Sequence, residues 1–311
     1  MTNTSSPTRG ILLIALGASE YGCMAANLAA SIRYHDSDIG IHLVHTDSSV
    51  SMLTDAHRAL FSSMQVCPME YYTRQGARDE GRGAIYMPSN TRPPSQIEFI
   101  KAKTHIYDLT PFDETLFLDV DMYILPHIHM SAVMSDLSAA CDYTIKNRGY
   151  ENLNGSYTHW FSVDEARAYY STEGRFYQSQ SEFIFFKRTK RNDALFANVR
   201  EVFDTRPIAG SDFRGSVSDE YAYNIAMALT GTYPHIDGYI PIYWYYLEGQ
   251  HDWNRKVVKN YIGFSLGGDS IPDWLISKIN VYKQLYKTAL KLPHLFNVAP
   301  KRRWNAKRKA M

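Results

Sequence analysis

The sequence predicts an α/β fold with a mostly parallel central sheet. Between residues 11 and 70, apolar runs alternate with segments in which small and apolar residues recur at helical spacing. This β-α-β-α-β order is typical of a parallel sheet. The chain has 311 residues, of which 45% are hydrophobic and 21% charged, the composition of a folded protein with a sizeable core. Disordered, collagen-like and small disulfide-stabilised proteins are thereby excluded.

The first elements follow one another closely. Strands are expected at residues 11–16, 39–45 and 64–68, with helices over 21–34 and 51–62 between them.

The loop after the first strand argues against a nicotinamide-dependent dehydrogenase. Such an enzyme needs the pattern G-x-G-x-x-G at this place, and Gly17 and Gly22 supply only its outer glycines.

The middle of the chain is expected to carry a long loop, a basic helix and a buried strand. Residues 73–95 are rich in glycine, proline and charge, which predicts a mobile loop of the kind that often forms a lid. A helix follows over residues 95–109 and carries Lys101 and Lys103. Residues 114–118 then form an apolar strand.

Two aspartates, Asp119 and Asp121, end this strand with one residue between them. In an extended chain residues i and i+2 face the same way, so both carboxylates can converge on one cation. Hard oxygen ligands suit Mg²⁺ or Mn²⁺, which commonly join carboxylates to substrate phosphates. The pattern predicts a metal and diphosphate site, and the alternative is a pair of solvated acids at a strand end.

The chain from Lys103 to Leu125 resembles the glycosyltransferases of the A-type fold, most closely the retaining, family 8-like enzymes. A basic helix, the turn Pro111-Phe-Asp-Glu and the run Leu116-Phe-Leu-Asp-Val-Asp are similar to that family's block around its D-x-D motif. Weaker similarity extends over residues 11–274. The resemblance implies a single Rossmann-like nucleotide-diphospho-sugar transferase domain.

The resemblance also implies where a nucleotide sugar binds. The loop after the first strand and Asp47, after the second, correspond to the nucleoside end of the family's site. Lysines near the D-x-D motif are candidates for the diphosphate. The candidate donor-binding residues are Ala15, Gly17, Ser19, Tyr21, Asp47, Lys101, Lys103, Val120, Gly267 and Gly268.

Candidate catalytic residues follow from the chemistry of sugar transfer. The sugar carbon passes through an oxocarbenium-like state, which a nearby carboxylate or amide stabilises. Gln180 resembles the start of the family's Asn-Ser-Gly strand, and Asp219 and Glu220 resemble its Asp-Gln pair. The alternatives are a surface turn at Gln180 and a helix N-terminus capped by Ser218.

The chain departs from the family pattern at its third metal ligand. That ligand is a histidine, and Gly263 stands at the matching position. His251 or His235 could complete the metal shell in its place, and substrate oxygens and water are the alternative.

The last 37 residues are strongly basic. From Leu275 to Met311 there are ten Lys and Arg and no Asp or Glu, so the remainder of the chain has a net charge of −9. An amphipathic helix over 275–292 and a basic tail are expected here. Such a tail suits an anionic partner, either a membrane surface or a nucleic acid, and a solubilising tail is the third alternative.

Together these features predict a metal-assisted hexosyl- or pentosyltransferase that uses a nucleotide sugar, with UDP as the expected nucleotide and retention of configuration. The acceptor is a membrane-linked glycan or a modified nucleic-acid base. The alternative is a non-catalytic relative that binds sugar nucleotides or nucleic acid. Residues 1–10 are expected to be disordered, 11–274 to form the catalytic domain, and 275–311 the basic helix and tail.

The cysteines and the hydropathy pattern indicate a cytoplasmic protein, with the tail allowing association with a membrane surface. Cys23, Cys67 and Cys141 are few and widely spaced, which is typical of reduced thiols. No segment reaches the ~20 apolar residues of a transmembrane helix.

Overall fold

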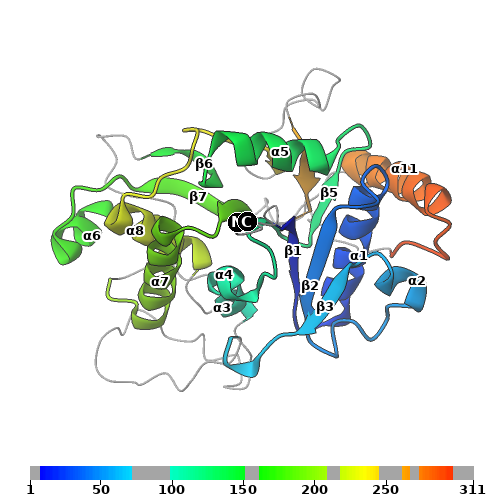
Figure 1. The fold of residues 1–311 in the computed structure, drawn as a ribbon, viewed down its shortest axis with the longest axis horizontal. Helices are drawn as coiled ribbons and strands as arrows, with labels where there is room; N and C mark the ends of the chain where they lie inside the picture. The colour runs from blue at the N-terminus through cyan, green and yellow to red at the C-terminus, as the bar shows by residue number, and fades with distance from the viewer. Residues whose placement is uncertain are drawn as a thin grey trace, which may run out of the picture.

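A six-stranded sheet forms the centre of the protein, in the order β3-β2-β1-β4-β7-β6 (Figure 1). The computed structural model describes residues 8–71, 99–150, 161–208, 218–244, 261–266 and 273–296. β1, β2, β3 and β4 run parallel, and β7 pairs antiparallel with both β4 and β6. The expected α/β fold with a mostly parallel sheet is confirmed. The strands are β1 (Arg9–Ala15), β2 (Gly40–His45), β3 (Ser63–Val66), β4 (Glu114–Leu118), β6 (Tyr143–Tyr150) and β7 (Tyr177–Lys187).

A second, three-stranded sheet starts where β4 ends. Its order is β5 (Met122–Ile124), β9 (Gly263–Ser265) and β8 (Ile242–Trp244). The chain turns at Val120 and Asp121 and enters β5 directly, and Leu266 N donates a 2.7 Å hydrogen bond to Asp121 O. The junction between the two sheets therefore lies at the carboxyl end of β4.

Helices cover both faces of the main sheet. The alternation of side chains along a strand sends Leu116 and Leu118 into one core and Phe117 into the other. In Figure 1, α1, α2 and α11 lie to one side of the view, and α6, α7 and α8 lie to the other. The first core includes residues of α1 (Ser19–Arg33), α5 (Met130–Ala140) and α11 (Asp273–Ala289), and the second includes residues of α4 (Ile106–Leu109), α6 (Val163–Tyr170), α7 (Lys190–Thr205) and α8 (Asp219–Thr230).

Two expected helices differ from the sequence prediction: one is shorter and the other is interrupted. In place of a helix over 51–62, only α2 (Asp55–Arg58) forms, because the chain then turns to bury Leu60 and Phe61 in the first core. The expected helix over 95–109 appears as α3 (Phe99–Thr104) and α4, with its first residues outside the described part. His105 separates the two helices at φ −106° and ψ 14°, held by stacking on Tyr71 at 4.3 Å between ring centroids. Tyr71 belongs to a short 3-10 helix (Met69–Tyr71).

Helix α11 packs into the first core. Tyr286 is fully buried and its hydroxyl donates a 2.7 Å hydrogen bond to Ile124 O in β5. Just beyond the helix, the Asn27 side chain exchanges two 3.0 Å hydrogen bonds with the backbone of Phe296. The residues up to Phe296 are thus tied to α1 and β5, while the basic tail from residue 297 onwards lies outside the described residues.

Lys283 was expected to lie on an exposed, basic face of this helix, but it is buried. This burial lowers its pKa to about 8. The apolar positions of α11 face the core through an arc wide enough to include this lysine, whereas Lys291 beyond the helix is exposed. The helix is therefore less basic on its outer side than its sequence suggested.

The described residues contain no helix with both the length and the apolar character needed to cross a bilayer. All three cysteines are free thiols; Cys23 and Cys67 are buried and Cys141 is half-buried.

Replacing Lys283 by Met is expected to stabilise the protein at neutral pH. The folded state carries the cost of a buried ammonium below about pH 8, and this cost disappears as the pH approaches the unfolded lysine value of about 10. The Lys283→Met variant should melt several degrees higher than the parent at pH 7, with the difference shrinking towards pH 10. Lys287→Met on the same helix is the control. An unchanged melting temperature at pH 7 would contradict the prediction.

Candidate active site

Three parallel strands bring their carboxyl ends to one edge of the sheet. Ala15 pairs with His45, and Leu13 pairs with Leu118. The loops that follow β1, β2 and β4 therefore lie side by side, next to the switch between β1 and β4 where open α/β sheets bind ligands. The proposed nucleoside-binding and D-x-D segments are brought together at this edge.

The first two of these loops are tied to each other. Gly17 N donates a 3.0 Å hydrogen bond to Thr46 Oγ1, and Ser48 Oγ donates one of 2.7 Å to Gly17 O. Gly17 has φ +84°, a conformation that glycine adopts without strain. The buried Ala15 carbonyl accepts a 2.7 Å hydrogen bond from Ser49 Oγ. The edge is consequently held in one arrangement by backbone and hydroxyl contacts.

The other expected nucleoside contacts have mixed accessibility. Ser19 begins α1, and it and Tyr21 are half-buried. Asp47 is exposed after β2. Gly22 allows α1 to pack closely on this edge, because a Cβ there would stand 2.0 Å from Ser49 O.

Asp119 is fixed on both of its carboxylate oxygens. Its Oδ1 accepts a 3.0 Å hydrogen bond from the N–H of the buried Val120, and its Oδ2 lies 2.6 Å from Lys103 Nζ. Its backbone N–H donates a 2.9 Å hydrogen bond to Glu182 O in β7. The carboxylate is therefore held by α3, by β7 and by its own turn.

The sequence had suggested that the two aspartates lie on one extended strand, but the structure does not show this. Val120 and Asp121 form a turn, because the chain changes from the main sheet to the small sheet at this point. Both carboxylates nevertheless act on the same ammonium group. Burial lowers the pKa of Lys103, but Asp119, Asp219 and Asp121 together raise it above the ordinary lysine value.

The two expected lysines of α3 have different partners. Tyr223 in α8 holds the backbone of Lys103 in place, because its hydroxyl donates a 2.7 Å hydrogen bond to the Lys103 carbonyl oxygen. Lys101 instead forms an ion pair of 3.3 Å with Asp204 in α7. Of the two, the structure brings only Lys103 into contact with Asp119.

Helix α8 presents two acidic residues at its first turn. Ser218 caps the helix by accepting a 3.2 Å hydrogen bond from Glu220 N, as the sequence predicted. The Glu220 carboxylate accepts hydrogen bonds from Ser181 N at 3.3 Å and from Ser218 Oγ at 3.0 Å. This arrangement joins the acidic turn to Ser181, in the middle of β7.

The carboxyl groups of Asp219 and Glu220 are harder to ionise than exposed ones. Burial raises the pKa of both, and the Asp219 charge raises that of Glu220 further, while Lys103 acts in the opposite direction. The pair therefore keeps a proton at pH values at which exposed carboxyl groups have lost theirs.

Three buried polar atoms near this turn have no hydrogen-bond partner among the described residues. They are Gln180 Oε1, Asp219 Oδ2 and Asn224 Nδ2. Asn224 is anchored through its Oδ1, which accepts a 2.7 Å hydrogen bond from Ser179 Oγ. Buried polar groups without partners are costly, and they are places where a polar ligand can supply the missing hydrogen bonds.

The site also contains a second lysine, Lys146, which the sequence analysis did not identify. Lys146 lies in β6, is fully buried, and contacts the carboxylate of Glu182 through its Nζ. The backbone carbonyl of Glu182 accepts the hydrogen bond from Asp119 N. A lysine in a strand at the edge of a sheet normally indicates a solvent-facing position. Its burial follows from the irregular pairing of β6 with β7, in which Ile145 faces Ile184 and Lys146 faces Gln180.

The structure gives a reason for the glycine at position 263, where the family resemblance implied a metal-binding histidine. Gly263 pairs with Ile124, and a Cβ at this glycine would stand 2.4 Å from Tyr123 O. No side chain fits there without moving β5. His251, Gly267 and Gly268 lie outside the described residues.

Two carboxylates at the end of β4 are candidate ligands for a divalent ion. Within the described ranges, no three His, Cys, Asp or Glu side chains gather in a metal-binding arrangement. Asp119 and Asp121 offer hard carboxylate oxygens, and Mg²⁺ is commonly held by one or two carboxylates together with substrate phosphates. The donor set therefore fits a metal that is completed by a diphosphate.

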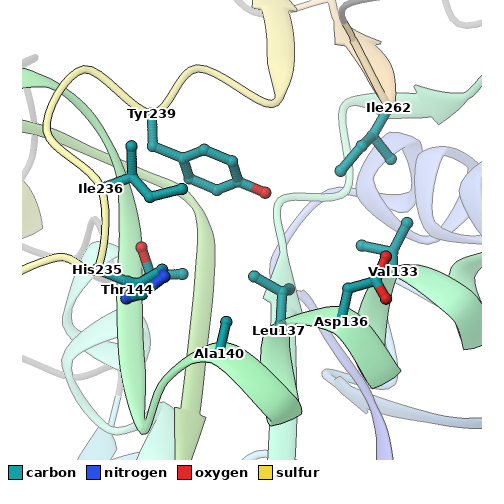
Figure 2. A pocket seen from close by; sticks show the side chains of 9 residues that line it. All are labelled: Val133, Asp136, Leu137, Ala140, Thr144, His235, Ile236, Tyr239 and Ile262. Carbon is teal, nitrogen blue, oxygen red and sulfur yellow. The ribbon is translucent and has the colours of Figure 1, made fainter.

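His235 lies in a different environment from these aspartates. Together with Thr144 and Tyr239 it lines a cavity of about 360 Å³ beside α5, shown in Figure 2. Most of the wall is apolar, and Figure 2 shows Leu137 and Ala140 of α5 along one side. Neither Asp119 nor Asp121 lines this cavity.

The fold is that of the A-type glycosyltransferases. The chain is similar to the apo structure of the bifunctional glycosyltransferase WbbM, with a TM-score of 0.52 and 10% identity over 93% of this chain and 53% of that one. It thus spans about half of WbbM. It is also similar to the galactosyltransferase LgtC in complex with donor and acceptor sugar analogues, with a TM-score of 0.50 and 10% identity over 93% of this chain and 97% of LgtC. No protein-family model and no curated protein matches the sequence.

Replacing Glu220 by Gln should make the protein less sensitive to high pH. Because its pKa is raised in the folded state, Glu220 contributes stability that is complete below the ordinary glutamate range and is lost as the pH rises through the folded value. The melting temperature of Glu220→Gln relative to the parent should rise by at least about 2 °C between about pH 5 and about pH 9. Glu173→Gln, at an exposed position, is the control. A pH-independent difference would show that Glu220 ionises normally.

Proposed function

We propose that the protein transfers a sugar from a nucleotide-sugar donor to an acceptor, with UDP as the nucleotide and a hexose or pentose as the sugar. The observation that carries the proposal is the placement of Asp119 and Asp121 at the carboxyl end of β4 in an A-type glycosyltransferase fold, beside Lys103. Both similar structures are glycosyltransferases, and one was determined with sugar analogues.

The donor lies along the edge formed by β1, β2 and β4 in this proposal. The nucleoside contacts the loop from Ala15 to Tyr21, after β1, and Asp47, after β2. Hydrogen bonds of Gly17 join these two loops. The diphosphate lies at Asp119, Asp121 and Lys103. The sugar then reaches the group of unpartnered polar atoms formed by Gln180, Asp219 and Asn224. This order follows the sheet edge from β2 to β7.

Departure of the nucleoside diphosphate requires neutralisation of the charge that builds on its leaving oxygen. A Mn²⁺ or Mg²⁺ ion held by Asp119 and Asp121 would supply most of this neutralisation when bound. The Lys103 ammonium adds a positive charge at the same place. Turn and strand contacts hold Asp119 in position, so little reorganisation is needed during the reaction.

The developing positive charge on the sugar carbon is stabilised by the acidic turn of α8. Asp219 is mostly buried, which strengthens its electrostatic effect, and Lys103 favours its ionised form. Glu220, in its protonated form, can donate a hydrogen bond, as the amide of glutamine does. The proton held by the pair thus gives the two neighbouring carboxyl groups different roles.

The acceptor and the cellular location form the outer part of the proposal. The basic tail beyond residue 296 suits an anionic partner, and both a membrane-linked glycan and a modified nucleic-acid base meet this requirement as acceptors. The enzyme would act in the cytoplasm, where the tail would allow it to associate with a membrane surface.

A binding protein without turnover is the second candidate function. Gly263 favours it, because the backbone of β5 leaves no room for a third protein ligand at this position. Turnover of any nucleotide sugar would exclude this candidate.

Donor binding tests the proposal directly. UDP and UDP-sugars should raise the melting temperature more in the presence of Mn²⁺ than in its absence, because metal and diphosphate complete each other's coordination. Asp119→Asn and Asp121→Asn should each abolish the Mn²⁺-dependent part and lower transfer by about 10²-fold or more. Asp38→Asn, before β2 at the opposite edge of the sheet, is the control. Unchanged transfer and donor hydrolysis in both site variants would refute the site assignment.

Analysis of the product tests the stereochemistry. We expect the new glycosidic bond to have the same anomeric configuration as the donor, which NMR coupling constants of the product distinguish. An inverted product would refute retention and leave the donor site unaffected.

A further inference from the structure

We infer that Lys103 is a counter-ion which holds Asp119 until a nucleotide diphosphate draws it away, so that the divalent ion and the nucleotide bind together. This inference rests on the proposed donor and metal site. It starts from the ion pair of 2.6 Å between Lys103 Nζ and Asp119 Oδ2.

The ion pair occupies the oxygen that a metal would need. Asp119 Oδ1 is already engaged by Val120 N at 3.0 Å, and Oδ2 is engaged by Lys103. A divalent ion that arrives alone must replace the ammonium at Oδ2 or share this oxygen with it. Either way a monovalent and a divalent cation come close together, which weakens the binding of the metal.

Lys103 is able to change partners without a change of fold. Its backbone is anchored to α8 through Tyr223 Oη, whereas its side chain is 22% exposed and that of Asp119 is 23% exposed. Ligands can therefore reach the ion pair. The flexible four-carbon stem of lysine allows the ammonium to move while its helix stays in place.

A diphosphate supplies the partner that the displaced ammonium requires. Its oxygens are anionic and would lie beside both the metal and Lys103, so the ammonium exchanges one anion for another. Asp119 Oδ2 would then be available to hold the metal, and the ammonium of Lys103 would not be left without an anionic partner. Nucleotide binding thus strengthens metal binding, and by linkage metal binding strengthens nucleotide binding by the same factor.

The same helix provides a matched control. Lys101 has the same charge two residues away, but its ammonium is paired with Asp204 at 3.3 Å. A general effect of positive charge on metal affinity would appear when either lysine is replaced, whereas competition for Asp119 would appear only at Lys103.

Titration of the full-length protein with Mn²⁺, followed by calorimetry or by electron paramagnetic resonance, tests the inference. In the absence of nucleotide, Lys103→Met should bind Mn²⁺ about tenfold more tightly than the parent, and Lys101→Met should differ from the parent by less than about twofold. The factor by which UDP strengthens Mn²⁺ binding should be smaller in Lys103→Met than in the parent. Should the methionine variant fail to fold, Lys103→Gln replaces it, with the same expected direction.

Three results would overturn the inference, and they separate it from the proposed function. Mn²⁺ binding in Lys103→Met that is no tighter than in the parent refutes the competition, while UDP-dependent Mn²⁺ binding in the parent leaves the proposed site standing. Equal tightening in both lysine variants shows a general charge effect and also refutes it. Absence of Mn²⁺ binding in every variant, even with UDP, refutes both the inference and the metal site.

Discussion

The ammonium of Lys103 allows several carboxylates to share one edge of the sheet. Asp119, Asp121 and Asp219 all act on it, and without a positive charge their mutual repulsion would oppose the folded arrangement. A second ammonium, that of the buried Lys146, contacts Glu182 close by. The site is thus rich in negative charge, and its two lysines come from different elements, α3 and β6.

The sheet topology determines where this charge is concentrated. Because β1, β2 and β4 are parallel, their carboxyl ends meet, and the antiparallel β7 brings the Gln180 to Glu182 segment to the same place from the opposite direction. The hydrogen bond between Asp119 N and Glu182 O joins the two halves. Helices α3 and α8 then add Lys103 and the acidic turn, and Tyr223 links these two helices. The charged groups at this edge are therefore carried by elements of the core or by the turn that directly follows β4.

The second sheet explains why position 263 is a glycine and not a histidine. A histidine at position 263 would collide with the backbone of Tyr123, so the glycine is required by the pairing of β5 with β9. In the proposed site, Asp119 and Asp121 would hold a divalent ion together with oxygens of the substrate.

The sequence by itself determined the order of elements, the parallel character of the sheet and the residues that end β4. These features depend on local patterns: apolar runs, helical spacing, the Ser218 cap and the closeness of two acids along the chain. Tertiary structure decided which charged groups meet. Lys101 and Lys103 are alike in sequence, yet only Lys103 reaches Asp119, because α3 is oriented by its contact with α8. The burial of Lys146 and Lys283 could not be predicted from the sequence either. It depends on strand register and helix packing, which bring together residues far apart in the chain.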